Sequence, residues 1–360
     1  MHRRVTAATF AFAAALGCLT VPSSRTATAA GPARDTCEPA AAHLAGGARE
    51  PYGAGHAAHG FGRGAHHAEL EARAGRAREP YAGAARMARP EGREPYQPGP
   101  RDLAEMDERL RRAPGARMAR QELVVPVRVH VITDGRKGAT DADVKRQIAV
   151  LNDAYGGRKG GVDTGVRFRL AGVDRKVNAE WFRDPLNNEQ AMKTALRRGG
   201  PETLNLYIAQ LSRLMLGYST YPHWYEREPR LDGVVIDWRT TPGGSLKDFD
   251  HGYTGVHEIG HWLGLLHTFE NGCHGRGDRV ADTPPEATPT EGCPKFKDTC
   301  KAPGADPIHN FMDYAHDRCM REFTRGQADR MRAVWRAYRV AGSPPQEQMR
   351  KPGLLPGTGL

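Results

Sequence analysis

The stretch HEIGHWLGLLH, residues 257–267, places three histidines and one glutamate within eleven positions. His257 and His261 are four residues apart, so on an α-helix their rings project from one face at neighbouring turns. If the helix continued, His267 would lie about 9 Å further along the axis and would be rotated away from that face. Gly264 can adopt the left-handed conformation that ends a helix and lets the chain double back. The sequence therefore predicts a helix that ends at Gly264, so that all three imidazoles meet at one point.

Three neutral imidazoles without a cysteine thiolate are typical of a catalytic zinc site, in which water keeps the fourth coordination position. Zinc lowers the pKa of a bound water to roughly 7, and Glu258, beside the first histidine, can accept its proton and return it to a leaving amine. We therefore predict that His257, His261 and His267 bind one Zn²⁺ and that Glu258 is the general base. A zinc-containing binding module without turnover is the alternative, but such a module has no need of Glu258.

The residues around this stretch have the periodicity of a folded α+β domain. Period-two patterns predict strands, and apolar residues at helical spacing predict helices. The predicted strands are 124–132, 166–173, 204–211 and 232–238, and the predicted helices are 141–157, 189–200, 251–266 and 324–339. This order favours a twisted mixed sheet with a backing helix and an active-site helix. A Pro- and Gly-rich irregular C-terminal subdomain and the final helix follow.

The N-terminal third of the chain has a different composition. Residues 1–29 begin with basic residues, continue with an apolar stretch and end in small residues, which is typical of a cleaved secretory signal peptide. A lipoprotein site at Cys18 is the alternative. Residues 30–120 are predicted to be a low-complexity, largely disordered prosegment, with a helical pattern that starts at residue 103. The predicted catalytic domain then covers residues 121–342, and a disordered tail covers 343–360.

The predicted prosegment contains a tetrapeptide three times. The sequence Arg-Glu-Pro-Tyr occurs at residues 49–52, 78–81 and 93–96. The spacing between the copies is not constant, which argues against a solenoid repeat.

The net charge of +10 does not indicate a nucleic-acid-binding protein. Residues 121–360 hold 34 basic and 30 acidic residues, a net charge of only +4. Without an aromatic-rich basic platform, this distribution argues against binding to nucleic acid. Beyond the signal peptide, no stretch is apolar enough to span a bilayer. We therefore expect a secreted, extracellular protein whose partners are protein or peptide substrates, and its oligomeric state stays open.

The string HExxHxxGxxH at residues 257–267 is the signature of the metzincin metalloproteases, which also carry a methionine turn downstream. Within the metzincins, the chain resembles the pappalysin family, especially its secreted prokaryotic members. Five strings carry this resemblance in order: GYSTYP at 217, DGVVID at 232, HEIGHWLGLLHTF at 257, ADTPP at 281 and NFMDY at 310. The resemblance covers roughly residues 122–340. A metzincin of another family, such as an astacin-like enzyme, is the alternative.

The resemblance implies a zinc-dependent endopeptidase with a metzincin-like catalytic domain. His257, His261 and His267 would bind zinc, and Glu258 would be the general base. Met312 would form the methionine turn beneath the metal. Tyr314 matches a family tyrosine that approaches the metal or steadies the oxyanion, a role that suits a phenol because it donates hydrogen bonds.

The cysteines indicate an oxidising compartment. After removal of the signal peptide, Cys37, Cys273, Cys293, Cys300 and Cys319 remain. The last four should form disulfides in an exported protein, and four cysteines allow three connectivities. The resemblance implies Cys273 with Cys300 and Cys293 with Cys319. Cys37 is then a possible latency ligand, because a prosegment thiolate can fill the open zinc position; a stray thiol in a disordered tract is the alternative.

Three further expectations concern activation, specificity and calcium. Relatives of the family often cut before arginine, so self-processing is expected near Arg117 or Arg120. Asp317 is the candidate to bind a substrate guanidinium. The carboxylate and hydroxyl oxygens of the loop GDRVADTPPEATPT suit a structural Ca²⁺, which relatives bind nearby; the candidate ligands are Asp278, Asp282, Thr283 and Glu286.

Overall fold

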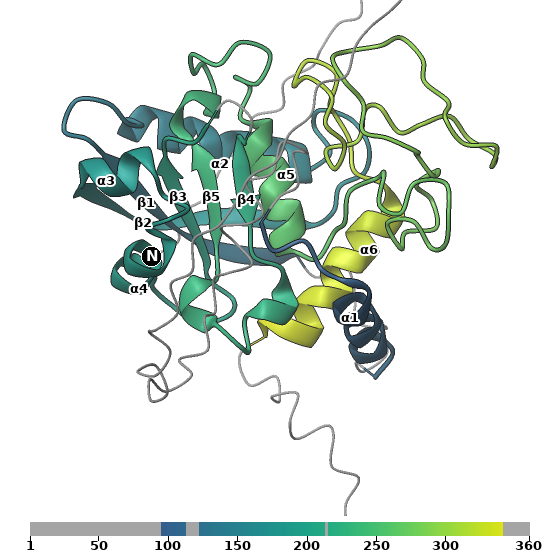
Figure 1. Ribbon diagram of the computed structural model, residues 1–360, viewed down its shortest axis with the longest axis horizontal. Helices are drawn as coiled ribbons and strands as arrows, with labels where there is room; N and C mark the ends of the chain where they lie inside the picture. Colours follow the sequence, from purple (N-terminus) through teal and green to yellow (C-terminus); the bar gives the residue numbers. More distant parts are fainter. Residues whose placement is uncertain (1–94, 113–121, 213–214, 341–360) are drawn as a thin grey trace, which may run out of the picture. The chain divides into compact units, whose positions relative to one another are not determined.

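Five strands form one mixed sheet in the order β2-β1-β3-β5-β4 (Figure 1). The four longer strands are parallel neighbours, and β4 pairs with β5 in the antiparallel direction at the edge of the sheet. The strands are β1 (Leu123–Thr133), β2 (Val166–Val177), β3 (Leu204–Ala209), β4 (Gly217–Ser219) and β5 (Val234–Asp237). The predicted strands correspond to β1, β2, β3 and β5, whereas β4 was not predicted.

The computed structural model describes residues 95–112, 122–212 and 215–340. The chain divides into residues 1–74 and residues 75–360, and everything described belongs to the second unit. Several predictions made from the sequence therefore concern residues outside the described ranges. They are the signal peptide, Cys37, the first two copies of the tetrapeptide, Arg117, Arg120 and the tail 343–360.

Alternating side chains of the strands pack into two apolar clusters, one on each face of the sheet. Leu206 and Ile208 of β3 join the main core with helices α2 (Asp141–Tyr155) and α5 (Tyr253–Trp262). Tyr207, between them in the sequence, belongs to a second cluster on the other face with α3 (Ala179–Arg183) and α4 (Glu189–Leu196). This period of two is what a strand covered on both faces requires. Figure 1 shows α5 beside β4, where the sheet ends.

The C-terminal part of the domain is mostly irregular between His267 and Thr324. Two disulfides cross-link it, Cys273–Cys300 and Cys293–Cys319, with Cα–Cα distances of 5.5 and 5.6 Å. Helix α6 (Arg325–Val334) follows, with a capping box between Thr324 and Gln327, and continues into the π-helical turn η4 (Trp335–Arg339). Three short 3-10 helices lie earlier in the chain: η1 (Pro222–Trp224), η2 (Pro229–Leu231) and η3 (Trp238–Thr240). The mixed sheet, its helices and this cross-linked region confirm the predicted α+β architecture.

Helix α1 (Pro100–Arg112), which lies within the predicted prosegment, packs on the C-terminal elements of the fold. It begins three residues before the pattern that predicted it. Leu103 contacts Leu266, just past the end of α5, and Met106 packs against Val334 of α6. Arg109 donates a 2.8 Å hydrogen bond to the carbonyl of Ala337. Thus α1 lies against the chain just after α5 and against α6 and η4. Among the described helices, none is long and apolar enough to cross a membrane.

Candidate metal centre and active site

Helix α5 ends in a tight turn that leads the chain back toward the two histidines of the helix, His257 and His261. Leu263 is the C-cap, and Gly264 follows with φ of +92°, a conformation that favours glycine. The N–H of Gly264 donates to the carbonyl of His261 (2.8 Å), and that of Leu265 donates to the carbonyl of Gly260 (2.9 Å). These two bonds make a Schellman motif. A Cβ at position 264 would also lie 2.7 Å from Cγ2 of Val334, so both conformation and space call for glycine.

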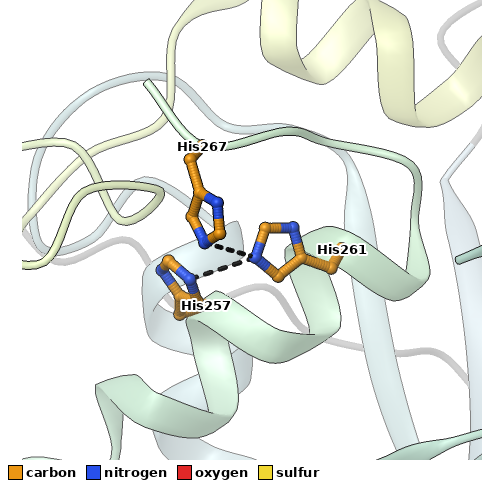
Figure 2. Close-up of side chains that lie close together, drawn as sticks. All are labelled: His257, His261 and His267. Carbon is orange, nitrogen blue, oxygen red and sulfur yellow. Dashed lines mark hydrogen bonds between the residues drawn. The ribbon is translucent and has the colours of Figure 1, made fainter. Parts of the chain in front are cut away.

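The turn brings the three histidines together. In Figure 2, His257 and His261 project from one side of α5, and His267 approaches from the loop beyond it. The Nε2 atom of His261 lies 3.1 Å from Nε2 of His257 and 3.1 Å from Nε2 of His267. All three side chains are buried. They are the single group of three or more His, Cys, Asp or Glu in the described ranges whose ligand atoms lie within 4.8 Å of one another.

Hydrogen bonds on the far side of two rings fix how they face the centre. Nδ1 of His257 lies 2.7 Å from the carbonyl of Phe311, and Nδ1 of His261 lies 2.9 Å from the carbonyl of Leu265. A carbonyl oxygen only accepts, so each Nδ1 carries the proton and each Nε2 presents a lone pair. Lone pairs that face each other at 3.1 Å repel unless a cation lies between them.

The spacing fits a zinc ion. Ligand nitrogens about 2.0–2.1 Å from a tetrahedral zinc are separated by roughly 3.3 Å. The observed separations are close to that value, and the donor set contains only imidazole nitrogens, which bind zinc well. The carbonyls of Phe311 and Leu265 are the kind of outer partner that orients metal-binding histidines. His257, His261 and His267 could therefore hold one metal ion.

Glu258 lies on α5 directly against the edge strand β4. Its side chain is 3% exposed. A Cβ placed on Gly217, the first residue of β4, would lie 2.6 Å from Cγ of Glu258 and 2.7 Å from Oε1. Since real Cβ atoms do not approach so closely, glycine at position 217 makes the space that the carboxylate fills. Sequence reasoning did not identify this contribution of Gly217.

Met312 and Tyr314 come from the loop that passes beneath and beside the histidines. Met312 is fully buried, and a Cβ on Gly260 would lie 2.4 Å from its sulfur atom. Gly260 lies on α5 between the first two histidines, so the thioether packs under them. The ring of Tyr314 is 5.6 Å from that of His257 and 5.0 Å from that of His267, measured between centroids. Both predicted residues thus lie at the metal-binding candidates.

Tyr221 is a further neighbour of the histidines that sequence reasoning missed. Its hydroxyl oxygen lies 2.8 Å from Nδ1 of His261, and its side chain is buried. Tyr221 belongs to the string GYSTYP, which carries part of the family resemblance, but its role depends on a contact between residues 40 positions apart. A local sequence pattern does not predict a contact between residues so far apart in the chain.

The disulfides have the pairing that the resemblance implies, Cys273 with Cys300 and Cys293 with Cys319. The two closed loops overlap in sequence and hold the irregular segment beside His267. Thr268, the next residue, donates from its N–H to the carbonyl of Met312 (3.2 Å) and from its hydroxyl to Glu286 (2.7 Å). The cross-linked segment thereby supports the third histidine.

The four calcium candidates do not gather at one point among the described residues. Asp278 accepts hydrogen bonds from Thr283, and burial raises the pKa of Asp278 to about 6. Asp282 instead accepts from Thr324 and Gly326 at the start of α6. Glu286 is compensated by Lys297, whose Nζ lies 2.5 Å from Oε1. Each carboxylate therefore has a structural partner of its own.

Asp317 lies ahead of the active-site helix. The side chain is 2% exposed, and its Oδ2 accepts a 2.8 Å hydrogen bond from the N–H of His251, two residues before α5. Burial raises the pKa of this carboxyl to about 7, well above the ordinary value of 3.8.

The chain is similar to extracellular metalloproteases. A family model described as pregnancy-associated plasma protein-A matches residues 244–336, which include the histidines and the methionine turn. An extracellular metalloprotease of Pyricularia oryzae is 44% identical over 236 residues, which cover 63% of this chain and 81% of that protein. One from Verticillium alfalfae is 46% identical over 232 residues, covering 62% and 79%.

Solved structures of a bacterial enzyme share the fold. Mature mirolysin of Tannerella forsythia, in complex with a cleaved peptide, is 28% identical with a TM-score of 0.55, covering 61% of this chain and 96% of that one. A promirolysin variant of the same organism has a TM-score of 0.56 at 27% identity, covering 66% and 88%. These relatives support a metalloendopeptidase over a binding module without turnover. The chain belongs to the pappalysin family of metzincin metalloendopeptidases.

Proposed function

We propose that this chain is a secreted zinc endopeptidase, made as a zymogen, in which His257, His261 and His267 hold the metal and Glu258 is the general base. The observation that carries the proposal is the meeting of three Nε2 atoms beside a buried glutamate. Zinc bound there supplies Lewis acidity, which makes water a usable nucleophile near neutral pH. Secretion is supported by the relatives, which are named extracellular metalloproteases.

Glu258 and Tyr314 divide the proton and charge movements between them. Glu258 takes a proton from the attacking water at its carboxylate and later gives it to the nitrogen of the leaving amine. Tyr314, whose ring lies against His257 and His267, donates a hydrogen bond from its hydroxyl to the oxyanion of the scissile carbonyl. Met312 contributes packing beneath the ligands.

Metal content and casein hydrolysis, measured together, test the assignment. The activated protein should contain one zinc per chain. Glu258→Ala should keep that zinc and lose casein hydrolysis by at least about 10³-fold, because it removes the proton acceptor only. His261→Ala should lose the zinc as well, and it is the matched control. Absence of stoichiometric zinc from the activated wild-type protein, or full activity of Glu258→Ala, would contradict the proposal.

A preference for arginine after the scissile bond is the finer part of the proposal. Asp317 supports it as a buried carboxylate just ahead of α5, because a carboxylate can accept two charge-assisted hydrogen bonds from a guanidinium. Digestion of a peptide mixture, followed by sequencing of the new N-termini, tests the preference. New termini without enrichment of arginine would remove it.

Latency is assigned to Cys37 in this proposal. A thiolate is a strong zinc ligand, and one from the prosegment can take the open coordination position. Cys37→Ala should then yield a secreted chain that hydrolyses casein before any processing, whereas Cys37→Ser would keep a weak oxygen donor and be less active. Unchanged latency in Cys37→Ala would remove this role.

Activation would occur between α1 and β1. Helix α1 ends at Arg112 and β1 begins at Leu123, so Arg117 and Arg120 lie in the connection between two elements. Cleavage there interrupts no described helix or strand. Sequencing the N-terminus of the activated enzyme checks the site, and a terminus within residues 123–340 would exclude it.

Structural calcium is a further part of the proposal. Asp278 and Thr283 are already in contact, and backbone carbonyls of the same loop would have to complete a site. Calcium at millimolar concentration should raise the melting temperature of the zinc-loaded protein, and Asp278→Asn should abolish that increase. An equal increase with magnesium would indicate a nonspecific effect of divalent cations.

A further inference from the structure

Tyr96, the last residue of the third Arg-Glu-Pro-Tyr copy, is inserted between elements of the catalytic domain. Its side chain is 9% exposed and belongs to the apolar cluster on the α3 and α4 face of the sheet, together with Met192 and Tyr218. The ring packs edge-on against Trp224, with centroids 5.5 Å apart. We call the space that receives it the Tyr96 pocket, formed by Glu189, Lys193, Tyr218 and Trp224.

The floor of the Tyr96 pocket is a buried ion pair. Glu189 is 2% exposed and Lys193 is fully buried, and Nζ of Lys193 lies 2.6 Å from Oε1 of Glu189. The hydroxyl of Tyr96 donates to Oε2 of the same carboxylate. A buried carboxylate oxygen that lost this donor would be left with an unsatisfied lone pair, which is costly. The pocket therefore discriminates a tyrosine from a phenylalanine of the same shape.

The backbone at Tyr96 indicates that docking constrains it. Its φ is +69°, in the left-handed region that non-glycine residues seldom occupy. A residue keeps such a conformation only where its surroundings over-determine it. Here the surroundings are the carboxylate of Glu189 and the ring of Trp224.

The same tetrapeptide occurs twice more upstream. Residues 1–100 contain three tyrosines, Tyr52, Tyr81 and Tyr96, and each one follows Arg-Glu-Pro. In a tract composed largely of Ala, Gly and Arg, these are the side chains with enough apolar area and a hydroxyl to fill the pocket. We propose that the Tyr96 pocket is a docking site for the Arg-Glu-Pro-Tyr tetrapeptide and that all three copies can occupy it.

The third copy has anchors that the other two lack. Gln97 donates a 3.0 Å hydrogen bond to Glu270, three residues after His267, and α1 packs on Leu266 through Leu103. The first copy is followed by Gly53 and the second by Ala82, so neither supplies that amide. The third copy therefore docks most tightly, and the others compete at the high effective concentration that a tether provides. The copy that docks decides which prosegment residues lie beside Glu270.

Binding of a synthetic copy to the full chain tests this site without depending on the proposed catalysis. The probe is a fluorescein-labelled nonapeptide of residues 47–55, GAREPYGAG, and fluorescence anisotropy gives its affinity. All chains carry Glu258→Ala to prevent turnover. The variant Tyr52→Ala/Tyr81→Ala/Tyr96→Ala should bind the peptide at least tenfold more tightly than the parent, whose pocket is occupied. Tyr96→Ala alone should bind at least threefold more weakly than the triple variant, because the upstream copies then compete.

Matched controls separate the pocket from other sites and from misfolding. A peptide with Tyr52→Phe should bind the triple variant at least tenfold more weakly, because it lacks the hydroxyl that Glu189 accepts. A triple Tyr→Phe chain keeps the ring volume and replaces the alanine variant should that one not fold. Trp224→Leu in the triple background should abolish binding. Equal affinity of parent and triple variant, or equal affinity of the tyrosine and phenylalanine peptides, would overturn the docking site. Equal affinity of Tyr96→Ala and the triple variant would overturn the exchange of copies.

Discussion

Gly217 packs directly against the side chain of Glu258, the proposed general base, and leaves no room for a Cβ at position 217. Replacing Gly217 with alanine places a methyl group 2.6 Å from Cγ of Glu258, so one of the two must move. A displacement of about 1 Å in a catalytic group costs on the order of 10²-fold in rate. We predict that Gly217→Ala lowers kcat for casein or peptide hydrolysis by about 10²-fold and leaves the metal content unchanged.

The control for this substitution is Ser219→Ala, at the other end of the same strand. Ser219 is buried and its hydroxyl donates to the carbonyl of Thr220 (3.0 Å), so the change removes a local hydrogen bond of β4 and adds no atom to the strand. A similar loss of kcat in both variants would mean that strand integrity, and not the position of Glu258, sets the rate.

Asp317 makes the proposed arginine preference dependent on pH. Burial raises the pKa of its carboxyl to about 7, so the group is neutral below that pH and negative above it. The negative form attracts a guanidinium. The ratio of kcat/KM for an arginine peptide to that for a matched leucine peptide should therefore rise roughly tenfold between pH 6 and pH 8.

Taking the ratio of two substrates cancels the pH dependence of the chemical step. Asp317→Asn keeps the size of the side chain and cannot ionise, so its ratio should be low and independent of pH. A wild-type ratio that stays constant over this pH interval would show that Asp317 does not contact the discriminating side chain.

At the scale of elements, a single buried arginine joins the last turn η4 to the active-site helix. Arg339 is fully buried; it bonds Asp232 at 2.8 Å and the carbonyl of Trp262, the last residue of α5, at 3.1 Å. Asp232 also accepts from the indole N–H of Trp262 (3.1 Å). Removing one partner of a buried ion pair typically costs about 3–5 kcal/mol, because the other charge is left uncompensated.

We predict that Arg339→Met lowers the free energy of unfolding by about 3–5 kcal/mol, measured by urea denaturation in the Glu258→Ala background. The double variant Arg339→Met/Asp232→Asn should recover part of that loss, because it removes the buried charge of Asp232, whose remaining cation in the single variant is Arg197 at 3.9 Å. A cost below about 1 kcal/mol for the single variant would show that the pair is not needed to hold α5 and η4 together.

Sequence patterns identified the elements that carry periodicity and missed those that do not. Strands β1, β2, β3 and β5 follow from apolar spacing, and the end of α5 just before Gly264 follows from that glycine. Strand β4 has three residues, too few to show a period of two. Arg339 and Tyr221 act through contacts 107 and 40 residues away in the sequence, so only the folded chain reveals them. Proximity in the sequence does not decide contacts either: Asp278 and Asp282 are four residues apart, yet Asp278 accepts from Thr283 and Asp282 from Thr324.

At the scale of the whole molecule, we predict that His223 makes the free energy of unfolding depend on pH. This side chain is buried in η1, with Nε2 3.9 Å from a carboxylate oxygen of Asp102 in α1, and burial lowers its pKa from 6.5 to about 4. In the unfolded chain the imidazole of His223 is protonated below about pH 6.5, whereas in the folded chain it is protonated only below about pH 4. Stability is therefore lost as the pH falls through this interval, by up to about 3 kcal/mol.

Urea denaturation at pH 7 and pH 4.5 measures this loss. His223→Gln, which cannot titrate, should show a smaller difference between the two pH values than the parent chain. Identical differences in both chains would mean that other groups account for the acid sensitivity.

The short border of the sheet limits what the enzyme can recognise. Strand β4 offers three residues to any chain laid alongside it, and each main-chain hydrogen bond contributes only about 1 kcal/mol net. Two or three such bonds therefore contribute about 2–3 kcal/mol of binding free energy. This is less than the roughly 4 kcal/mol that a millimolar dissociation constant requires. Most of a substrate's affinity must then come from the fit of individual side chains. At this edge, unlike the opposite edge formed by the twelve-residue strand β2, the same brevity leaves too little exposed backbone to nucleate a sheet with a second copy of the protein.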